Sequence, residues 1–354
     1  MSDAYLALED GRVVEARGRV PGRTRGELVF TTAYTGYEES LTDPSYEEQV
    51  LTFSYPLIGN YGVREERFES DRVHPRAAIS HEFTEDVVEW LEGENVPAID
   101  HIDTRDLVTS IREEGAMKCG IAVGDDVTPE DAEAELDQCK GMSEHVDIGK
   151  RVTTVEHTTY GDGDTDVALV DCGAKMSIVD SLVERNATVH VLSYDTTPEE
   201  IAEVDPDLLF ISNGPGDPAN FEAAQELVEE YVGEVPIAGI CLGQQVVARA
   251  LGGTTEKMAF GHRGVNQPVR DLDSGKVVMT TQNHGYTVGE PGDQLDVKQV
   301  NVNDGTAEGL ANDELDVITR QYHPEAHPGP HDSLGFFDDV LSMTASGQHV
   351  VADD

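Results

Sequence analysis

Basic residues are scarce in this chain of 354 residues. Lysine and arginine together number 24 against 70 aspartates and glutamates, which gives a formal net charge of -46. Neutralising the phosphates of nucleic acid requires a basic surface, so the charge argues against nucleic-acid binding and equally against anionic membranes. The acidic residues are spread along the chain, which indicates an acidic surface of the halophilic kind. We therefore expect a salt-rich environment, in which screening weakens the self-repulsion.

Long apolar runs and paired cysteines are also missing. No apolar run approaches the length of about 20 residues that spans a bilayer, and residues 1–4 lack the start of a secretory signal. The four cysteines, Cys119, Cys139, Cys172 and Cys241, show no spacing typical of a zinc site or a disulfide framework. We expect a cytoplasmic protein with reduced thiols and no membrane segment.

Two domains of different character are predicted. Residues 1–150 mix short strands and helices and indicate a smaller α/β domain, and residues 151–166 resemble a flexible linker. From residue 167 to 354 strands and helices alternate, which predicts an open, mostly parallel sheet with helices on both faces. The expected helices are 83–91, 104–114, 128–140, 175–185, 198–204 and 242–251, and the expected strands of the second domain are 167–170, 189–192, 208–211, 237–240, 277–280 and 317–319.

Cys241 follows a short apolar run, residues 235–240, and precedes a segment with helical spacing. The cysteine therefore sits at a sharp strand-to-helix turn, and Gly239 and Gly243 remove the side chains that would crowd it. At the start of a helix the dipole favours a thiolate. The pattern predicts a nucleophile; the alternative is a small buried cysteine at the end of a core strand.

A cysteine nucleophile needs a base, and the base needs a group that orients it. His323 and Glu325 follow an expected strand at 315–320 and are two residues apart. In extended backbone the two side chains share one side, so they could hydrogen-bond and leave the other imidazole nitrogen for Cys241. The alternative is a surface histidine next to a helix start.

The histidines of the same segment also suggest a metal site. In the zinc-binding helix motif, glutamate directly follows the first histidine. Here Pro324 follows His323, and further prolines interrupt the segment that carries His327 and His331. We predict no metal site.

Residues 212–218, Ser-Asn-Gly-Pro-Gly-Asp-Pro, follow the expected strand 208–211. Glycine and proline at this density indicate a tight turn with exposed backbone amides. Such amides could stabilise an oxyanion, although the turn could also be an ordinary strand-to-helix connection. No Lys-Ser or Lys-Thr follows, so it is not a phosphate-binding loop.

Together, the motifs Gly-Ile-Cys-Leu-Gly-Gln at 239–244, Ser-Asn-Gly-Pro-Gly-Asp-Pro at 212–218 and Tyr-His-Pro-Glu at 322–325 resemble those of class I, triad-type glutamine amidotransferases. This resemblance covers roughly residues 165 to 345. A second resemblance, to the small subunit of carbamoyl phosphate synthetase, extends it over nearly the whole chain. The runs that carry it are 26–39, 41–46, 55–62, 102–107, 261–269 and 282–286.

The resemblance implies roles for individual residues. Cys241 would attack the side-chain amide carbon of L-glutamine. His323 would protonate the departing ammonia and then activate water against the thioester, while Glu325 orients His323. The amides of Gly216 and Leu242 would hold the oxyanion. The implied glutamine-binding residues are Ser45, Gly214, Gly216, Leu242, Gln245, Asn283, Gly285 and Tyr286. Ser45 belongs to the first domain, so the pocket is expected where the two domains meet.

The resemblance also implies a partner. The chain would pass ammonia to the ATP-using large subunit of carbamoyl phosphate synthetase, in a heterodimer that serves arginine and pyrimidine biosynthesis. No phosphate-binding loop occurs here, so ATP and magnesium are expected on the large subunit and no cofactor on this chain. Two alternatives remain: an amidotransferase subunit of another synthetase, and a catalytically silent regulatory subunit.

Overall fold

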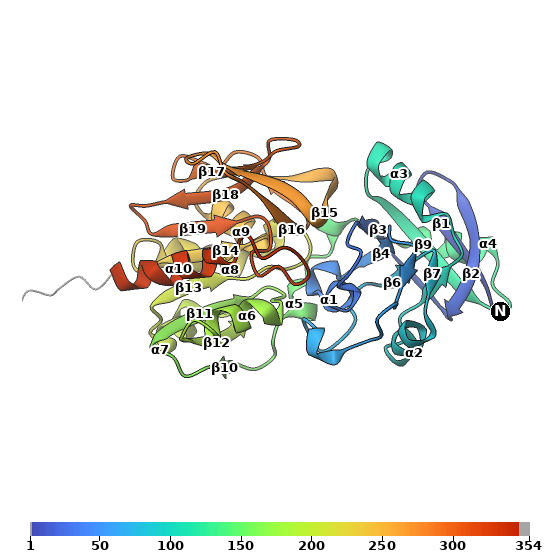
Figure 1. The fold of residues 1–354 in the computed structure, drawn as a ribbon, viewed down its shortest axis with the longest axis horizontal. Coiled ribbons are helices and arrows are strands. Elements are labelled where there is room, and N and C mark those ends of the chain that lie inside the picture. The colour runs from blue at the N-terminus through green and yellow to red at the C-terminus, as the bar shows by residue number, and fades with distance from the viewer. Residues whose placement is uncertain (1, 347–354) are drawn as a thin grey trace, which may run out of the picture. The chain divides into compact units, whose positions relative to one another are not determined.

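Two units make up the described part of the chain, residues 2–346 of a computed structural model (Figure 1). The first unit runs to Val146 and includes Met258–Val265, and the second contains Asp147–Lys257 and the chain from Asn266 onward. The first boundary lies close to the predicted one. The return of residues 258–265 to the first unit was not predicted.

The first unit is built on a closed barrel, whereas the sequence predicted only a mixed α/β domain. The strands follow one another around the barrel in the order β1-β2-β8-β6-β4-β3-β9. Apolar side chains such as Leu6, Leu28 and Ile121 fill one core cluster of this unit. The barrel strands are β1 (Ser2–Leu8), β2 (Val13–Val20), β3 (Gly22–Thr31), β4 (Gln49–Phe53), β6 (Ala77–Ile79), β8 (Ala98–Asp100) and β9 (Met117–Gly124).

The predicted helices of the first unit are confirmed with small changes at their ends. The helix predicted at 104–114 is present with the same bounds, but its cap is Asp103, whose side chain accepts the Asp106 N–H at 3.0 Å. The helix predicted at 128–140 ends at Leu136. The remaining elements are α1 (Tyr37–Thr42), η1 (Pro44–Tyr46), β5 (Leu57–Ile58), η2 (Glu65–Arg67), β7 (Glu82–Phe83), α2 (Glu85–Gly93), α3 (Thr104–Glu114), α4 (Pro129–Leu136) and η3 (Met142–Glu144).

The second unit contains a ten-stranded sheet in the order β10-β12-β11-β13-β14-β19-β18-β17-β15-β16. The five strands from β12 to β19 pair in parallel, whereas β10 and the run from β19 through β18 and β17 to β15 pair antiparallel. The sheet is therefore mixed, and "mostly parallel" holds only for its centre. The strands are β10 (Thr158–Tyr160), β11 (Thr165–Asp171), β12 (Ala187–Ser193), β13 (Leu208–Ile211), β14 (Ile237–Ile240), β15 (Thr255–Asp271), β16 (Val277–Val288), β17 (Asp296–Asn301), β18 (Ala307–Asn312) and β19 (Val317–Arg320).

Helices cover both faces of this sheet, as the alternation predicted. Side chains of α6 and α10, such as Leu182 and Phe337, share one core cluster with strand residues such as Phe210. In Figure 1 these two helices lie in front of the sheet, and α8 and α9 lie behind it. The helical elements are α5 (Gly149–Val152), α6 (Met176–Val183), α7 (Pro198–Val204), η4 (Pro218–Asn220), α8 (Glu222–Tyr231), α9 (Leu242–Ala250) and α10 (Gly335–Ser346).

The predicted linker at 151–166 is wrong, because this segment belongs to the second unit. Strand β10 lies within it and pairs antiparallel with β12 at the edge of the sheet. Its glycines serve close packing: a Cβ on Gly163 would lie 1.9 Å from the carbonyl oxygen of Asn186. The composition that suggested flexibility therefore reflects a close backbone approach.

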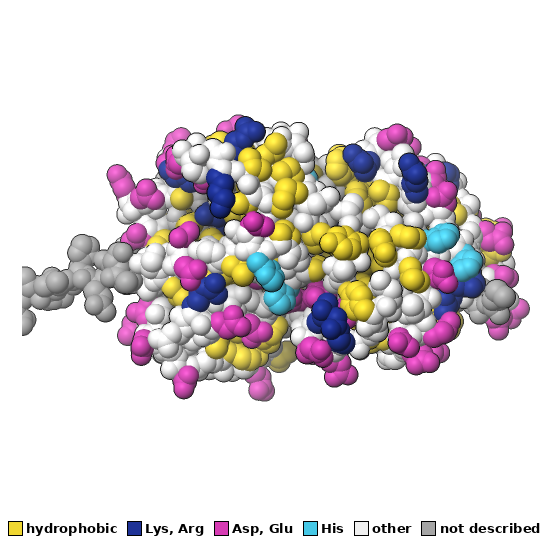
Figure 2. All heavy atoms as spheres, in the orientation of Figure 1, with side chains coloured by type: hydrophobic (Ala, Val, Ile, Leu, Met, Phe, Trp, Pro, Cys, Tyr) yellow, Lys and Arg dark blue, Asp and Glu magenta, His cyan; other side chains and the backbone are white. Residues whose placement is uncertain are grey.

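Two surface properties bear on the sequence predictions. On the face shown in Figure 2, aspartate and glutamate side chains are scattered and do not form one block. No helix in residues 2–346 has both the length and the apolar character needed to cross a membrane.

Candidate active site

Cys241 occupies the turn between β14 and α9, as predicted. Its backbone has φ 55° and ψ -104°, a conformation that is strained for a residue with a Cβ and is typical of a nucleophile elbow. The flanking glycines are required by space. A Cβ on Gly239 would lie 2.8 Å from the Gly243 backbone, and a Cβ on Gly243 would lie 2.1 Å from the Ile211 carbonyl oxygen.

Backbone carbonyl groups of β19 and β16 hold this cysteine in place. The Cys241 N–H donates to the Arg320 carbonyl of β19 at 2.7 Å. The Cys241 thiol donates to the Asn283 carbonyl oxygen, with a sulfur–oxygen distance of 3.7 Å. The residue is 2% exposed. Asn283, which the sequence predicts to bind glutamine, thus contacts Cys241, the predicted nucleophile.

His323 and Glu325 interact as the spacing predicted. Nδ1 of His323 lies 2.6 Å from Oε1 of Glu325, and both side chains are buried. The His323 N–H donates to the Thr281 carbonyl at 2.8 Å, which fixes the backbone beside β16. Nε2 of His323 is buried and has no hydrogen-bond partner among the described residues. It is therefore free to exchange a proton with a bound reactant.

The electrostatics of this pair favour an imidazolium beside a carboxylate. Burial alone would lower the pKa of His323, but the Glu325 carboxylate and Cys241 together raise it to about 10. Burial alone would raise the pKa of Glu325, but Lys175 and His323 hold that pKa far below its ordinary value. At neutral pH both members of the pair are charged.

Lys175 is a member of the site that the sequence reading missed. Its ammonium donates to Glu325 Oε1 at 2.9 Å and to the His327 carbonyl oxygen at 2.5 Å. The side chain is almost fully buried, although lysine is rarely buried without a partner. Its place in the sequence gave a signal: it follows Asp171, the last residue of β11, and so lies at the same sheet edge as Cys241.

The turn at 212–218 lies beside the nucleophile helix. A Cβ on Gly214 would lie 2.1 Å from the Cys172 carbonyl oxygen and 2.8 Å from the Leu242 side chain. Gly216 has φ 89°, which favours glycine. The Lys175 N–H donates to the Asn213 side-chain oxygen at 3.1 Å, which ties the turn to the segment that carries Lys175.

A hydrogen bond between Gln245 of α9 and Tyr286 of β16 joins two residues that the sequence predicts to bind glutamine. The Gln245 side-chain nitrogen donates to the Tyr286 carbonyl oxygen at 2.8 Å and to the Gln321 side-chain oxygen at 3.1 Å. Gln245 lies on α9 and is 2% exposed, so its side chain faces the interior of the second unit. Asn283, Gly285 and Tyr286 all lie on β16, next to the strand position that holds His323.

Ser45 lies in the first unit, within η1, and is 5% exposed. Its N–H donates to the Asp43 side chain at 2.9 Å, so the segment is a turn capped by Asp43. The described geometry thus accounts for the turn at Ser45, and its role in glutamine binding stays a prediction.

The other cysteines differ from Cys241 in their surroundings. Burial raises the pKa of Cys119 and of Cys172 well above the ordinary value for a thiol, and burial also raises the pKa of Cys139. All four cysteines are free thiols. Only Cys241 combines a strained elbow with a neighbouring histidine, among the thiols of the described residues.

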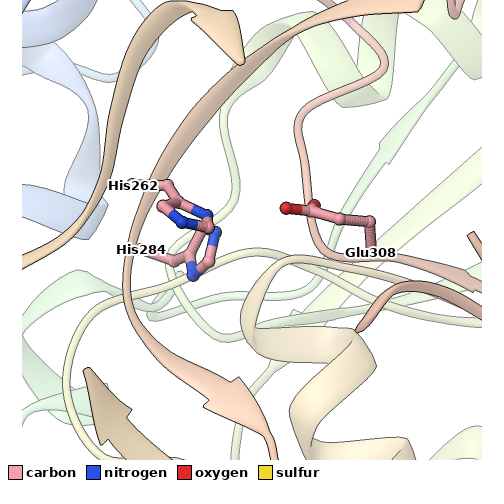
Figure 3. A group of neighbouring side chains, drawn as sticks. All are labelled: His262, His284 and Glu308. Atoms are coloured by element: carbon pink, nitrogen blue, oxygen red, sulfur yellow. The ribbon is translucent and has the colours of Figure 1, made fainter. Parts of the chain in front are cut away.

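One group of side chains has the composition of a metal site. His262, His284 and Glu308 offer ligand atoms within 4.8 Å of one another (Figure 3). Both ring nitrogens of His284 are engaged, however: Nδ1 donates to the Tyr286 carbonyl at 2.8 Å, and Nε2 lies 3.0 Å from the Gln282 side-chain oxygen. A metal ligand needs an unprotonated and available nitrogen, so we assign no metal to this group.

Comparison with known proteins places the chain in a family. Residues 168–343 match the family model of class-I glutamine amidotransferases, and residues 6–121 match that of the carbamoyl-phosphate synthase small chain, CPSase domain. The curated carbamoyl phosphate synthase small chain of Halobacterium salinarum is 71% identical over 343 residues, which cover 97% of each chain. The chain belongs to the carbamoyl phosphate synthase small-chain family.

Two further small chains of this family show the same full-length match. That of Archaeoglobus fulgidus is 44% identical and covers 96% of this chain and 98% of its own. That of Methanocaldococcus jannaschii is 41% identical and covers 96% of this chain and 99% of its own. The family predicted from the motifs is confirmed, and with it the function of a glutamine-hydrolysing enzyme subunit.

Proposed function

We propose that this chain hydrolyses L-glutamine at Cys241 and delivers the ammonia to the large subunit of carbamoyl phosphate synthase. One observation carries this assignment. Cys241 sits on a strained elbow at the start of α9 and interacts with a buried His323, whose Nδ1 is held by Glu325. This arrangement meets the requirements of a cysteine nucleophile with an oriented acid–base partner.

In the first half of the reaction, Cys241 attacks the side-chain amide carbon of glutamine as a thiolate, while its proton is held on Nε2 of His323. A sulfur–carbon bond forms, and the carbonyl oxygen becomes an oxyanion. The amides of Gly216 and Leu242 would hold this oxyanion at the start of the helix. When the carbon–nitrogen bond breaks, His323 Nε2 gives its proton to the departing nitrogen, so ammonia leaves and a thioester remains.

In the second half, the neutral His323 takes a proton from water while the water oxygen attacks the thioester carbon. A second oxyanion forms at the same position. When the carbon–sulfur bond breaks, glutamate leaves and the Cys241 sulfur and His323 return to their starting state. Glu325 keeps Nδ1 in place throughout, so Nε2 always faces the reactants.

Substrate recognition would use residues around this centre. Backbone groups at glycines allow close approach of the ligand, and buried amides and hydroxyls fix its orientation. The proposed glutamine-binding residues are Ser45, Gly214, Gly216, Leu242, Gln245, Asn283, Gly285 and Tyr286.

The large subunit would supply ATP and magnesium chemistry, and we assign no cofactor to this chain. Free ammonia is protonated in water and then no longer acts as a nucleophile, so transfer within a heterodimer is the physical reason for a separate glutaminase chain. The acidic surface gives no site for nucleic acid. We place this reaction in the cytoplasm, where thiols stay reduced, and in the supply of carbamoyl phosphate to arginine and pyrimidine biosynthesis.

The test is ammonia release from glutamine by the assembled enzyme in molar KCl. Cys241→Ser should abolish release while the variant still binds the large subunit. Cys139→Ser, which changes another buried thiol, should leave release unchanged. Undiminished release by the Cys241→Ser variant would remove this mechanism. Absence of release by the unaltered assembled enzyme would support the alternative of a silent regulatory subunit.

A further inference from the structure

A cavity of about 270 Å³ lies within the second unit, apart from the catalytic residues. It is lined by the turn between β15 and β16, by β17 and β19, and by the start of α10. None of the residues assigned to glutamine chemistry lines it. Its lining combines two cations with several carboxylates, and this charge pattern decides what it can bind.

Arg320 is the buried cation of this cavity. It is 8% exposed, and its guanidinium carbon lies 5.2 Å from the ring centroid of Phe336. Nη1 donates to the Thr319 carbonyl oxygen at 2.8 Å. Nε is buried without a hydrogen-bond partner, and no ion pair involves Arg320 among the described residues. Asp271, also in the lining, lies near enough for the charge of Arg320 to help lower its pKa, but no carboxylate of the described residues forms an ion pair with this buried guanidinium.

The other charges of the lining are also unpaired. Lys276, in the turn after β15, forms no ion pair within the described range, and neither do Asp332 and Asp339 at the start of α10. Asp271 differs, because it accepts the N–H and the hydroxyl of Ser274 at 2.8 and 2.6 Å. The cavity therefore presents the buried guanidinium of Arg320 and the carboxylates of Asp332 and Asp339, and these groups form no ion pair with one another.

We propose that this cavity binds a small zwitterion of the free α-amino acid class. The ligand carboxylate takes a charge-assisted hydrogen bond from Arg320, and the ligand ammonium faces Asp332 and Asp339. A simple anion would meet those two carboxylates, and a simple cation would meet Arg320, so only a ligand with both charges satisfies the lining.

The proposal predicts how three probes rank. L-Alanine carries both charges, acetate carries only the carboxylate, and methylammonium carries only the ammonium. In calorimetric titrations of the full chain at one fixed KCl concentration, L-alanine should bind at least about tenfold more tightly than either single-charge probe.

Variants locate the binding site. Arg320→Gln and the double variant Asp332→Asn/Asp339→Asn should each weaken L-alanine binding at least about tenfold. The control Asp293→Asn/Asp313→Asn removes an equal number of negative charges from exposed positions outside the cavity, and it should bind L-alanine like the unaltered chain. Asp332 and Asp339 are exposed, so substituting them should not disturb folding. Their double variant therefore tests the proposal even if Arg320→Gln does not fold.

Three results would overturn the proposal. The first is no L-alanine binding tighter than about 10 mM. The second is acetate binding as tight as that of L-alanine. The third is L-alanine binding that the Asp332→Asn/Asp339→Asn variant leaves unchanged, because the amino acid would then sit elsewhere, for example in the glutamine site.

Discussion

Glu325→Gln should destabilise the second unit, because it leaves the ammonium of Lys175 buried without an anion. The two groups are 2.9 Å apart and each residue is 1% exposed. At an effective dielectric constant of about 20, their Coulomb attraction is about 6 kcal/mol. Part of this attraction offsets the cost of desolvating the two charges. Removing one partner of a buried pair lowers the free energy of unfolding by about 3–5 kcal/mol.

The double variant Lys175→Met/Glu325→Gln separates this cause from lost packing. With both charges gone, no buried charge stands alone, so the double variant should regain most of the lost stability. We expect an interaction energy of about 2–3 kcal/mol between the two substitutions. Glutaminase activity should stay low, because nothing anionic then orients His323.

Equilibrium urea unfolding of the four proteins, at one fixed molar KCl concentration, measures these free energies. In thermal unfolding the Glu325→Gln loss corresponds to a decrease in Tm of about 6–20 °C for a unit of this size. Two results would refute the reasoning: a Glu325→Gln variant within about 1 kcal/mol of the unaltered chain, or strict additivity of the two single substitutions.

Three further predictions follow from the same geometry and charge. The Glu325 carboxylate raises the pKa of His323, so Glu325→Gln should lower that pKa and move the alkaline limb of the kcat/KM profile to lower pH; an unmoved limb would deny this role. Gly243→Ala places a Cβ 2.1 Å from the Ile211 carbonyl oxygen and should cost about 1–3 kcal/mol in chemical unfolding, whereas Gly93→Ala, which meets nothing within 4 Å, should cost nothing. Dilution from molar to millimolar KCl should lower the Tm, because the net charge of -46 loses its screening; a constant Tm would argue against a halophilic surface.

The strand-to-helix turn at Cys241 could be predicted because its determinants are local. A short apolar run, two glycines at fixed offsets and a following helical pattern specify the elbow without distant contacts. The pair of His323 and Glu325 is local for the same reason, since two residues of extended backbone bring both side chains to one side.

The barrel and the antiparallel half of the sheet depend on distant pairing. Strand β1 pairs with β9, which lies over a hundred residues later in the chain. Nothing in the sequence of either strand specifies which other strand it pairs with. The connection from β17 to β18 is short, and such connections join antiparallel strands, whereas parallel strands need a longer crossover. The short connection could therefore have predicted the antiparallel pairing of β17 and β18 from the sequence.

Lys175 shows the limit of motif reading within the site itself. Its contact with Glu325 joins positions 150 residues apart, and a lysine after a strand usually lies at the surface. The position of Lys175 at the sheet edge, together with a buried glutamate that requires a cation, would have been needed to predict the pair.

The central claim is that a thioester forms on Cys241, and rapid quenching in acid during glutamine turnover tests it most directly. Mass spectrometry of the digested chain should then find the glutamyl adduct on the peptide that contains Cys241 and not on those with Cys119, Cys139 or Cys172. Ammonia release without any adduct, or an adduct on another cysteine, would contradict the account.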